Sequence, residues 1–191
     1  MAMNMPRFKS AIRLWMAENL KVTRYQDGSQ IPNVTNTSTW SGLTSGAWTY
    51  YNNDASNNAV YGKLYNWYAV ADSRGLCPTG WHVPTVAEWT ALSDHLGGSN
   101  VAGGKMKATG TQYWRSPNVG ATNESGFTAL PGGSRFLGGS FLDQGYYAYF
   151  WSSSEDSSDV AWYRGLGYVF SGLGRGNYGK RVGFSVRCLR D

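Results

Sequence analysis

The sequence predicts a single α+β domain with short strands, few helices and long ordered loops. Its 191 residues fit one domain, with or without a short N-terminal extension. Hydrophobic residues make up 41% of the chain and charged residues only 15%, so the chain can bury a sizeable core. The 9 Trp, 13 Tyr and 7 Phe occur beside 25 Gly, a composition typical of loop-rich folds rather than helical bundles.

The N-terminal part is expected to hold short strands and loops. Trp15 to Leu20, together with Val22 and Tyr25, has the apolar content of one or two short strands. Asp27-Gly28 predicts a turn after them. Residues 33–46 are rich in Thr, Ser, Asn and Gly and are therefore predicted to be loop.

Two segments carry helical signals. Between Tyr61 and Asp72, apolar residues recur at helical spacing, which predicts a first helix that ends near Gly75. The second helix is marked more strongly, because Thr85 is placed as an N-cap and Glu88 stands three residues later, completing a capping box. Gly97-Gly98 should terminate this helix, whose apolar stripe is formed by Val86, Trp89, Leu92 and Leu96.

Beyond Gly98 the signals indicate short strands and turns. Gly138-Gly139 separates two apolar segments between Ser134 and Leu142, which predicts a hairpin. In the following strand, alternate residues should face opposite sides. From residue 162 to 168, one side carries large side chains, at Trp162, Arg164, Leu166 and Tyr168, and the other carries Tyr163, Gly165 and Gly167.

The glycines of this strand and of residues 172–179 need an explanation, because glycine weakens a strand and has no side chain to pack. A surface whose composition is free to change explains them, and it indicates binding rather than catalysis. Outward Tyr163, Phe170 and Tyr178 beside small residues resemble the composition of adaptable paratopes. Replacing these three together is expected to abolish ligand binding with little change in melting temperature. The alternative is that the aromatic residues fill the core and the glycines serve turns.

The two cysteines, Cys77 and Cys188, are too few for a metal site built from closely spaced ligands. Either they form one disulfide or they are two buried thiols. A disulfide closing so long a loop would contribute about 4–5 kcal/mol in the chain-entropy model.

Charge and hydropathy exclude two classes of partner. The net charge is +5, but the Lys and Arg residues are scattered and form no basic, aromatic-interleaved patch, so nucleic acid is not expected as a partner. No stretch is long and apolar enough to span a bilayer, and residues 1–9 lack the apolar segment of a secretory signal. We therefore expect no membrane insertion by this chain.

Several motifs occur together, in order, as they do in one known family. The chain resembles the Fibrobacter succinogenes major paralogous domain over residues 14–191, which leaves residues 1–13 as an N-terminal extension. The matching segments are Trp15–Leu20, Tyr61–Val70, Cys77–Thr85, Ala121–Phe127, Ala129–Gly133, Phe150–Glu155 and Gly183–Cys188. That domain is similar in turn to formylglycine-generating enzymes, through Pro84–Trp89 and the closing Gly–Phe strand. The resemblance implies a C-type-lectin-like fold with two helices, a small mixed or antiparallel sheet and long ordered loops.

Members of this fold include the variable target proteins of diversity-generating retroelements, in which codons of a C-terminal segment are rewritten at template adenines. The resemblance therefore implies a hypervariable ligand-binding protein, displayed outside the cell on a cell surface or a phage virion, whose partner is a protein or glycan on a cell surface. The expected variable face consists of Asp156, Tyr163, Gly165, Gly167, Val169, Phe170, Gly172, Gly174, Gly176, Asn177, Tyr178 and Val182.

An enzyme related to formylglycine-generating enzymes is one alternative, and an invariant surface structural module is another. The enzymes rely on a close pair of cysteines in the C-terminal part, where this chain has only Cys188. Their iron-dependent relatives need three histidines, and only His82 and His95 are present. We predict that His82 satisfies a main-chain carbonyl, that His95 faces solvent and that Glu88 serves the capping box.

No cofactor or metal is therefore expected. Four carboxylates, Asp54, Glu155, Asp156 and Asp159, are of the kind that binds calcium in some lectins of this fold, but the sugar-binding calcium motif of those lectins is missing.

Overall fold

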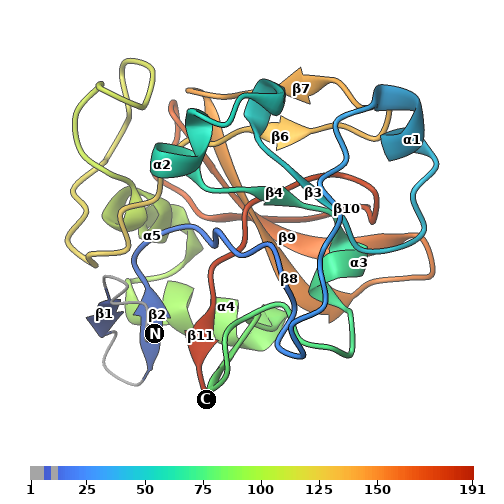
Figure 1. Ribbon diagram of the computed structural model, residues 1–191. Helices are drawn as coiled ribbons and strands as arrows, with labels where there is room; N and C mark the ends of the chain where they lie inside the picture. Colours follow the sequence, from blue (N-terminus) through green and yellow to red (C-terminus); the bar gives the residue numbers. More distant parts are fainter. Residues whose placement is uncertain (1–6, 10–12) are drawn as a thin grey trace.

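The computed structural model describes residues 7–9 and 13–191, and these form a mixed α/β structure (Figure 1). Two long strands cross its centre, two helices lie toward one end, and short helices and hairpins lie toward the other. The helices of the described residues are α1 (Thr37–Ser41), α2 (Asn57–Tyr61), α3 (Trp67–Val70), α4 (Val86–His95) and α5 (Ser99–Met106), with a 3-10 turn η1 (Tyr51–Asn53).

The strands form four small sheets in the described part of the chain, and neighbouring strands are antiparallel throughout. The largest sheet has the order β1-β2-β11-β5 and the central one β10-β9-β8, while β3 pairs with β4 and β6 with β7. Within residues 7–9 and 13–191, parallel pairing occurs only as isolated bridges, such as the one between Phe150 and Ser185. The strand bounds are β1 Arg7–Lys9, β2 Leu14–Met16, β3 Trp48–Thr49, β4 Leu64–Tyr65, β5 Trp81–His82, β6 Ser134–Arg135, β7 Phe141–Leu142, β8 Tyr147–Glu155, β9 Val160–Gly167, β10 Gly174–Gly179 and β11 Leu189–Arg190.

Helix α4 confirms the stronger of the two helix predictions. The Thr85 hydroxyl accepts a hydrogen bond from the main-chain N–H of Glu88, and the Glu88 carboxylate accepts one from the N–H of Thr85. The helix buries Trp89 and Leu92 against the sheet. This cap satisfies amide groups that a helix start would otherwise leave without partners.

The predicted helix over Tyr61–Asp72 is wrong, because the segment divides into the end of α2, the strand β4 and the short helix α3. Gly62 adopts a φ of +70° and ends α2. Leu64 and Tyr65 then pair with β3 and with Phe184 instead of continuing a helix. The side chain of Asn66 accepts a hydrogen bond from the N–H of Ala69 and starts α3.

Two further helices were not predicted. Helix α1 lies inside the predicted loop and is capped by Asn36, whose side chain accepts a hydrogen bond from the N–H of Thr39. Helix α5 follows α4 directly and contains Gly103 and Gly104, residues that disfavour a helix in isolation. The hairpin at β6–β7 and the strand β9 are confirmed.

The central sheet separates two hydrophobic clusters. One face of β8 and β9 contributes Phe150 and Leu166 to a cluster that includes Trp89 of α4. The opposite face contributes Trp151 and Ala161 to a cluster formed with β4 and the C-terminal segment. Because successive side chains point to opposite faces of a strand, β8 and β9 contribute residues to both clusters.

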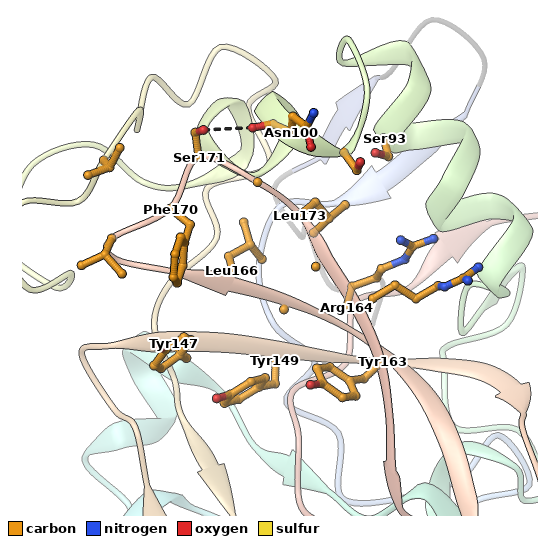
Figure 2. A pocket seen from close by; sticks show the side chains of 18 of the residues that line it. Ser93, Asn100, Tyr147, Tyr149, Tyr163, Arg164, Leu166, Phe170, Ser171 and Leu173 are labelled. Atoms are coloured by element: carbon orange, nitrogen blue, oxygen red, sulfur yellow. Dashed lines mark hydrogen bonds between the residues drawn. The ribbon is translucent and has the colours of Figure 1, made fainter.

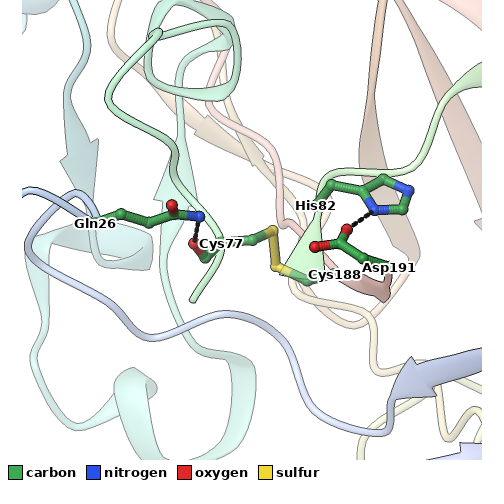
Figure 3. The surroundings of a disulfide bond; sticks show 5 residues. All are labelled: Gln26, Cys77, His82, Cys188 and Asp191. Carbon is green, nitrogen blue, oxygen red and sulfur yellow. Dashed lines mark hydrogen bonds and ion pairs between the residues drawn. A yellow bond between two sulfur atoms is a disulfide. The ribbon is translucent and has the colours of Figure 1, made fainter. Parts of the chain in front are cut away.

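Cys77 and Cys188 form a disulfide bond, so the alternative of two free thiols is wrong (Figure 3). The bond joins the segment before β5 to the segment before β11, with a sequence separation of 111. Both cysteines belong to the hydrophobic cluster on the Trp151 side of the sheet. The Cys77 carbonyl accepts a hydrogen bond of 2.7 Å from the side chain of Gln26.

Candidate functional site

A cleft of about 1190 Å³ opens where β9 and β10 separate. Strands β9 and β10 are paired from Val160 and Gly179 to Gly165 and Gly174, and beyond this point the connecting segment moves away toward α5. The gap is lined by main chain without side chains, at Gly165, Gly167, Gly172 and Gly174. A β-carbon on any of these four glycines would lie within 3.4 Å of a neighbouring atom, so the chain is closely packed at this part of the cleft.

One wall of the cleft is a row of tyrosines from neighbouring strands (Figure 2). The rings of Tyr147 and Tyr149 are stacked with centroids 5.7 Å apart, and Tyr163 meets Tyr149 edge-on at 5.7 Å. The Tyr149 hydroxyl donates a hydrogen bond of 2.9 Å to Asp143. Burial, and then the charge of Asp143, raises the pKa of Tyr149 well above its ordinary value, so its phenol stays protonated at neutral pH.

The opposite wall comes from α4, the start of α5 and the large-residue face of β9. Arg164 is buried there and donates a hydrogen bond of 2.7 Å to the hydroxyl of Thr90. Burial lowers the pKa of Arg164. Its partner across the strands, Arg175, is exposed and lies over the ring of Trp162 at 4.9 Å.

Phe170 is the most exposed large apolar side chain of the cleft, with 57% of its surface accessible, and its neighbour Val169 is also exposed. Figure 2 places Phe170 between the tyrosine row and the segment that runs to Ser171. The cleft thus combines a fixed tyrosine wall with an exposed apolar rim.

The cleft brings together a large part of the predicted variable face. Its lining includes Tyr163, Gly165, Gly167, Val169, Phe170, Gly172 and Gly174. The other five members lie outside the cleft, and they are Asp156, Gly176, Asn177, Tyr178 and Val182. Asn177 donates a hydrogen bond of 2.6 Å to Asp156 on the exposed surface, Tyr178 packs edge-on against Phe136, and Gly176 lies under the ring of Tyr163.

Two expectations about this face need correction. Val182 is only 1% exposed and belongs to the hydrophobic core, so it is not part of an exposed surface. Tyr163 and Tyr178 are half-buried, and their ring centroids lie 5.1 and 6.2 Å from that of Phe184. Replacing them is therefore expected to change stability, contrary to the prediction from sequence.

The cleft also contains residues from outside the segment predicted to form the variable face. Tyr147 and Tyr149 come from β8, and Ser93, Asp94 and Asn100 come from α4 and α5. Alternation of tyrosines along residues 147–149 was the available signal for the first two. The helical residues carry no comparable signal, since only the fold brings them to the strand.

The residues considered for catalysis, His82, His95 and Glu88, lie outside the cleft. His82 contacts Glu88 at 3.0 Å through Nε2 and Asp191 at 2.6 Å through Nδ1, rather than the main-chain carbonyl that was predicted. His95 is exposed, as predicted. Burial raises the pKa of Glu88, but hydrogen bonds from Thr85 and His82 outweigh it and leave the pKa below its ordinary value.

The remaining carboxylates do not gather. Glu155 forms an ion pair with Lys180, and Asp54 accepts a hydrogen bond from the N–H of Ser56. Over residues 7–9 and 13–191, no group of three or more His, Cys, Asp or Glu side chains is arranged to hold a metal ion. No helix in the same residues is both long and apolar enough to cross a membrane.

Comparison with known proteins yields one match. The model of the Fibrobacter succinogenes major domain matches residues 9–190. No curated protein and no solved structure matches the chain. Because the match spans nearly the whole chain, this protein belongs to the Fibrobacter succinogenes major domain family.

Proposed function

We propose that this chain is a non-enzymatic ligand-binding protein whose C-terminal segment forms the binding surface. The observation that carries the proposal is the cleft at the end of β9, which is lined by the residues that the sequence singled out between Tyr163 and Gly174. Its volume of about 1190 Å³ exceeds that of common ligand pockets, which measure roughly 300–1,000 Å³. A partner of macromolecular size, such as a protein loop or a glycan chain, suits an open cleft of these dimensions.

The composition of the cleft favours recognition over chemistry. Tyrosine provides a large contact area with little loss of side-chain entropy, and it dominates adaptable binding surfaces. Here three tyrosines form one wall and Phe170 forms the rim. The charged residues that line the cleft are Asp94, Arg164 and Arg175. The guanidinium of Arg164 donates to Thr90, and that of Arg175 lies over the ring of Trp162. A protein or glycan ligand on a cell surface is therefore the proposed partner.

We further propose that the scaffold is C-type-lectin-like and that the chain is a variable protein of a diversity-generating retroelement. Family membership and the pairing of the N-terminal strand β2 with the C-terminal strand β11 favour such a scaffold. The Cys77–Cys188 disulfide favours display outside the cell, on a cell surface or a phage virion, because disulfides persist in oxidising compartments.

Sequencing of the encoding locus across many isolates tests this function. The proposal expects a near-copy of the last codons downstream, a reverse transcriptase gene, and differences at adenines that fall on Tyr163, Gly165, Gly167, Val169 and Phe170. Codons for the buried Arg164 and Leu166 should be unchanged. An invariant segment without a second copy would overturn the diversification.

A second function, an invariant surface structural module, is favoured by one observation. Gly165, Gly167 and Gly176 lie beneath tyrosine rings, so packing alone accounts for the lack of side chains there. The same comparison of isolates separates the two. Joint conservation of each glycine with its tyrosine would support the module, whereas independent change at Val169 and Phe170 would support the binding protein.

A further inference from the structure

The segment between β9 and β10 carries the exposed rim of the cleft yet has a defined path. Val169 and Phe170 project from it, and they are among the few exposed large apolar residues of the described chain. Exposed side chains contribute little to ordering a loop, because they bury little apolar area. Tyr168 and Leu173, on either side of these residues, pack on a hydrophobic cluster. Residues 169 and 170 themselves are therefore held by contacts of the main chain.

Lys107, the residue that follows α5, provides the central contact. Its side chain is fully buried, and its Nζ donates hydrogen bonds to the main-chain oxygens of Val119, Gly167 and Phe170, at 2.9, 2.9 and 2.8 Å. The ammonium also lies 5.3 Å from the ring centre of Trp114. Two of the three oxygens belong to the cleft segment, and the third belongs to the loop beside it.

The remaining anchors of the segment also use main-chain atoms. The N–H of Val119 donates to the oxygen of Tyr168 at 2.8 Å, and the N–H of Gly104 donates to the oxygen of Ser171 at 2.7 Å. The N–H of Leu173 donates to the oxygen of Ser99 at 2.7 Å. The Ser171 hydroxyl adds a side-chain contact to the oxygen of Asn100. Neither Val169 nor Phe170 contributes a side-chain hydrogen bond to this set.

A buried ammonium suits this position because its three N–H donors equal the number of carbonyl oxygens around it. Burial lowers the pKa of Lys107 to about 8, and no neighbouring charge in the described part of the chain contributes to the shift. The uncharged amine has two donors and would leave one carbonyl oxygen without a partner. The methionine side chain has a similar length and has no hydrogen-bond donor.

We propose that Lys107 is the positioning residue of the cleft, holding the segment from Gly167 to Phe170 by its main chain so that the side chains at 169 and 170 can change without altering its path. The proposal rests on the proposed function for its purpose, since a diversified surface needs a backbone that is independent of its side chains. The arrangement itself can be tested without any ligand.

Amide hydrogen exchange of two variants provides the test. In Lys107→Met, the amides of Val119, Phe170 and Leu173 should exchange at least about tenfold faster, because carbonyl oxygens lose their buried donor and the segment opens locally. The β8 amides should change much less. The matched control is Lys105→Met, since Lys105 is on the same helix end and its ammonium pairs with Glu124 on the surface. In the double variant Val169→Ser/Phe170→Ser, exchange of the same amides should equal that of the unmodified protein.

The unmodified protein supplies a second readout in case Lys107→Met does not fold. After correction for intrinsic exchange, protection of the segment should rise relative to β8 as pH increases above about 8. Burial holds the pKa of Lys107 in the closed segment below its value in the opened one, so opening takes up a proton. A merely structural role of the side chain predicts no such local pH profile. Unchanged or uniform protection in Lys107→Met, no pH profile, or loss of protection in Val169→Ser/Phe170→Ser would each overturn the proposal. A locus without diversification would contradict the proposed function and leave these results standing.

Discussion

Tyr163 and Gly176 face each other directly across β9 and β10, and the tyrosine ring covers the glycine. A β-carbon placed on Gly176 would lie 2.9 Å from both Cε1 and the hydroxyl oxygen of Tyr163. The same ring approaches Gly165, where the corresponding distance to Cε2 is 3.3 Å. The glycines and the tyrosine thus form one packing unit, in which the ring occupies the space that side chains would fill.

This packing predicts the effect of enlarging Gly176. Gly176→Ala should lower the free energy of unfolding by about 1–3 kcal/mol, because the added methyl displaces the ring of Tyr163. In a Tyr163→Ala background the loss should vanish, which a double-mutant cycle by urea denaturation measures. Gly174→Ala is the control, since its β-carbon would meet only the oxygen of Gly165, at 3.4 Å. An equal loss in both backgrounds would contradict the packing unit.

Some aromatic residues of the cleft should stabilise the fold, whereas others should tolerate replacement with little change in stability. Phe170→Ala should change the free energy of unfolding by less than about 0.5 kcal/mol, since the ring is largely exposed. Tyr163→Ala should lower it by about 1–3 kcal/mol, because the ring packs against Phe184. Leu142→Ala, at an exposed position outside the cleft, is the matched control for Phe170. Thermal or urea unfolding gives all three values, and similar losses for Phe170 and Tyr163 would be inconsistent with this division.

The disulfide should contribute strongly to stability. Cys77→Ala/Cys188→Ala should lower the free energy of unfolding by about 2–5 kcal/mol, because the unfolded chain loses a long-range constraint. Urea unfolding with and without a thiol reductant measures the effect. The reductant should destabilise the unmodified protein and leave the double variant unchanged. Sensitivity of the double variant to the reductant would show that the bond is not the cause.

Glu88 should make stability depend on pH in the acid range. Its pKa in the folded protein lies below the ordinary value of 4.5, so its contribution is present above pH 4.5 and is lost as pH falls through the folded pKa. The free energy of unfolding of Glu88→Gln should therefore fall less steeply with decreasing pH. Thr85→Ala should lower it by about 1 kcal/mol through the loss of the helix cap, even at neutral pH. Parallel pH profiles for Glu88→Gln and the unmodified protein would exclude this contribution.

Local patterns in the sequence determined several elements correctly. The Thr85–Glu88 capping box specified the start of α4, the pair Gly138-Gly139 specified the β6–β7 hairpin, and alternation specified the two faces of β9. Each of these depends on interactions between residues close in sequence. The same alternation located the part of the cleft that β9 contributes, because the side on which a strand residue lies follows from its position alone.

Other features depend on contacts between residues far apart in the chain. Leu64 and Tyr65 belong to a run of apolar residues at helical spacing. Pairing with Trp48, Thr49 and Phe184 nevertheless makes them a strand. Val182 looks like a surface residue within its glycine-rich segment, but it lies against the core.

The cleft shows the same division between local and long-range information. Gly103 stands in α5, where glycine disfavours a helix, because a β-carbon there would lie 2.0 Å from the main-chain oxygen of Gly172. Lys107 resembles any surface lysine in the sequence, and only the folded chain surrounds it with three carbonyl oxygens. Helix α4, the β6–β7 hairpin and the alternating faces of β9 could be predicted from the sequence, since they follow from neighbouring residues. The position of the cleft depends on the folded chain, because the hydrogen bonds of Lys107 join segments up to 63 residues apart.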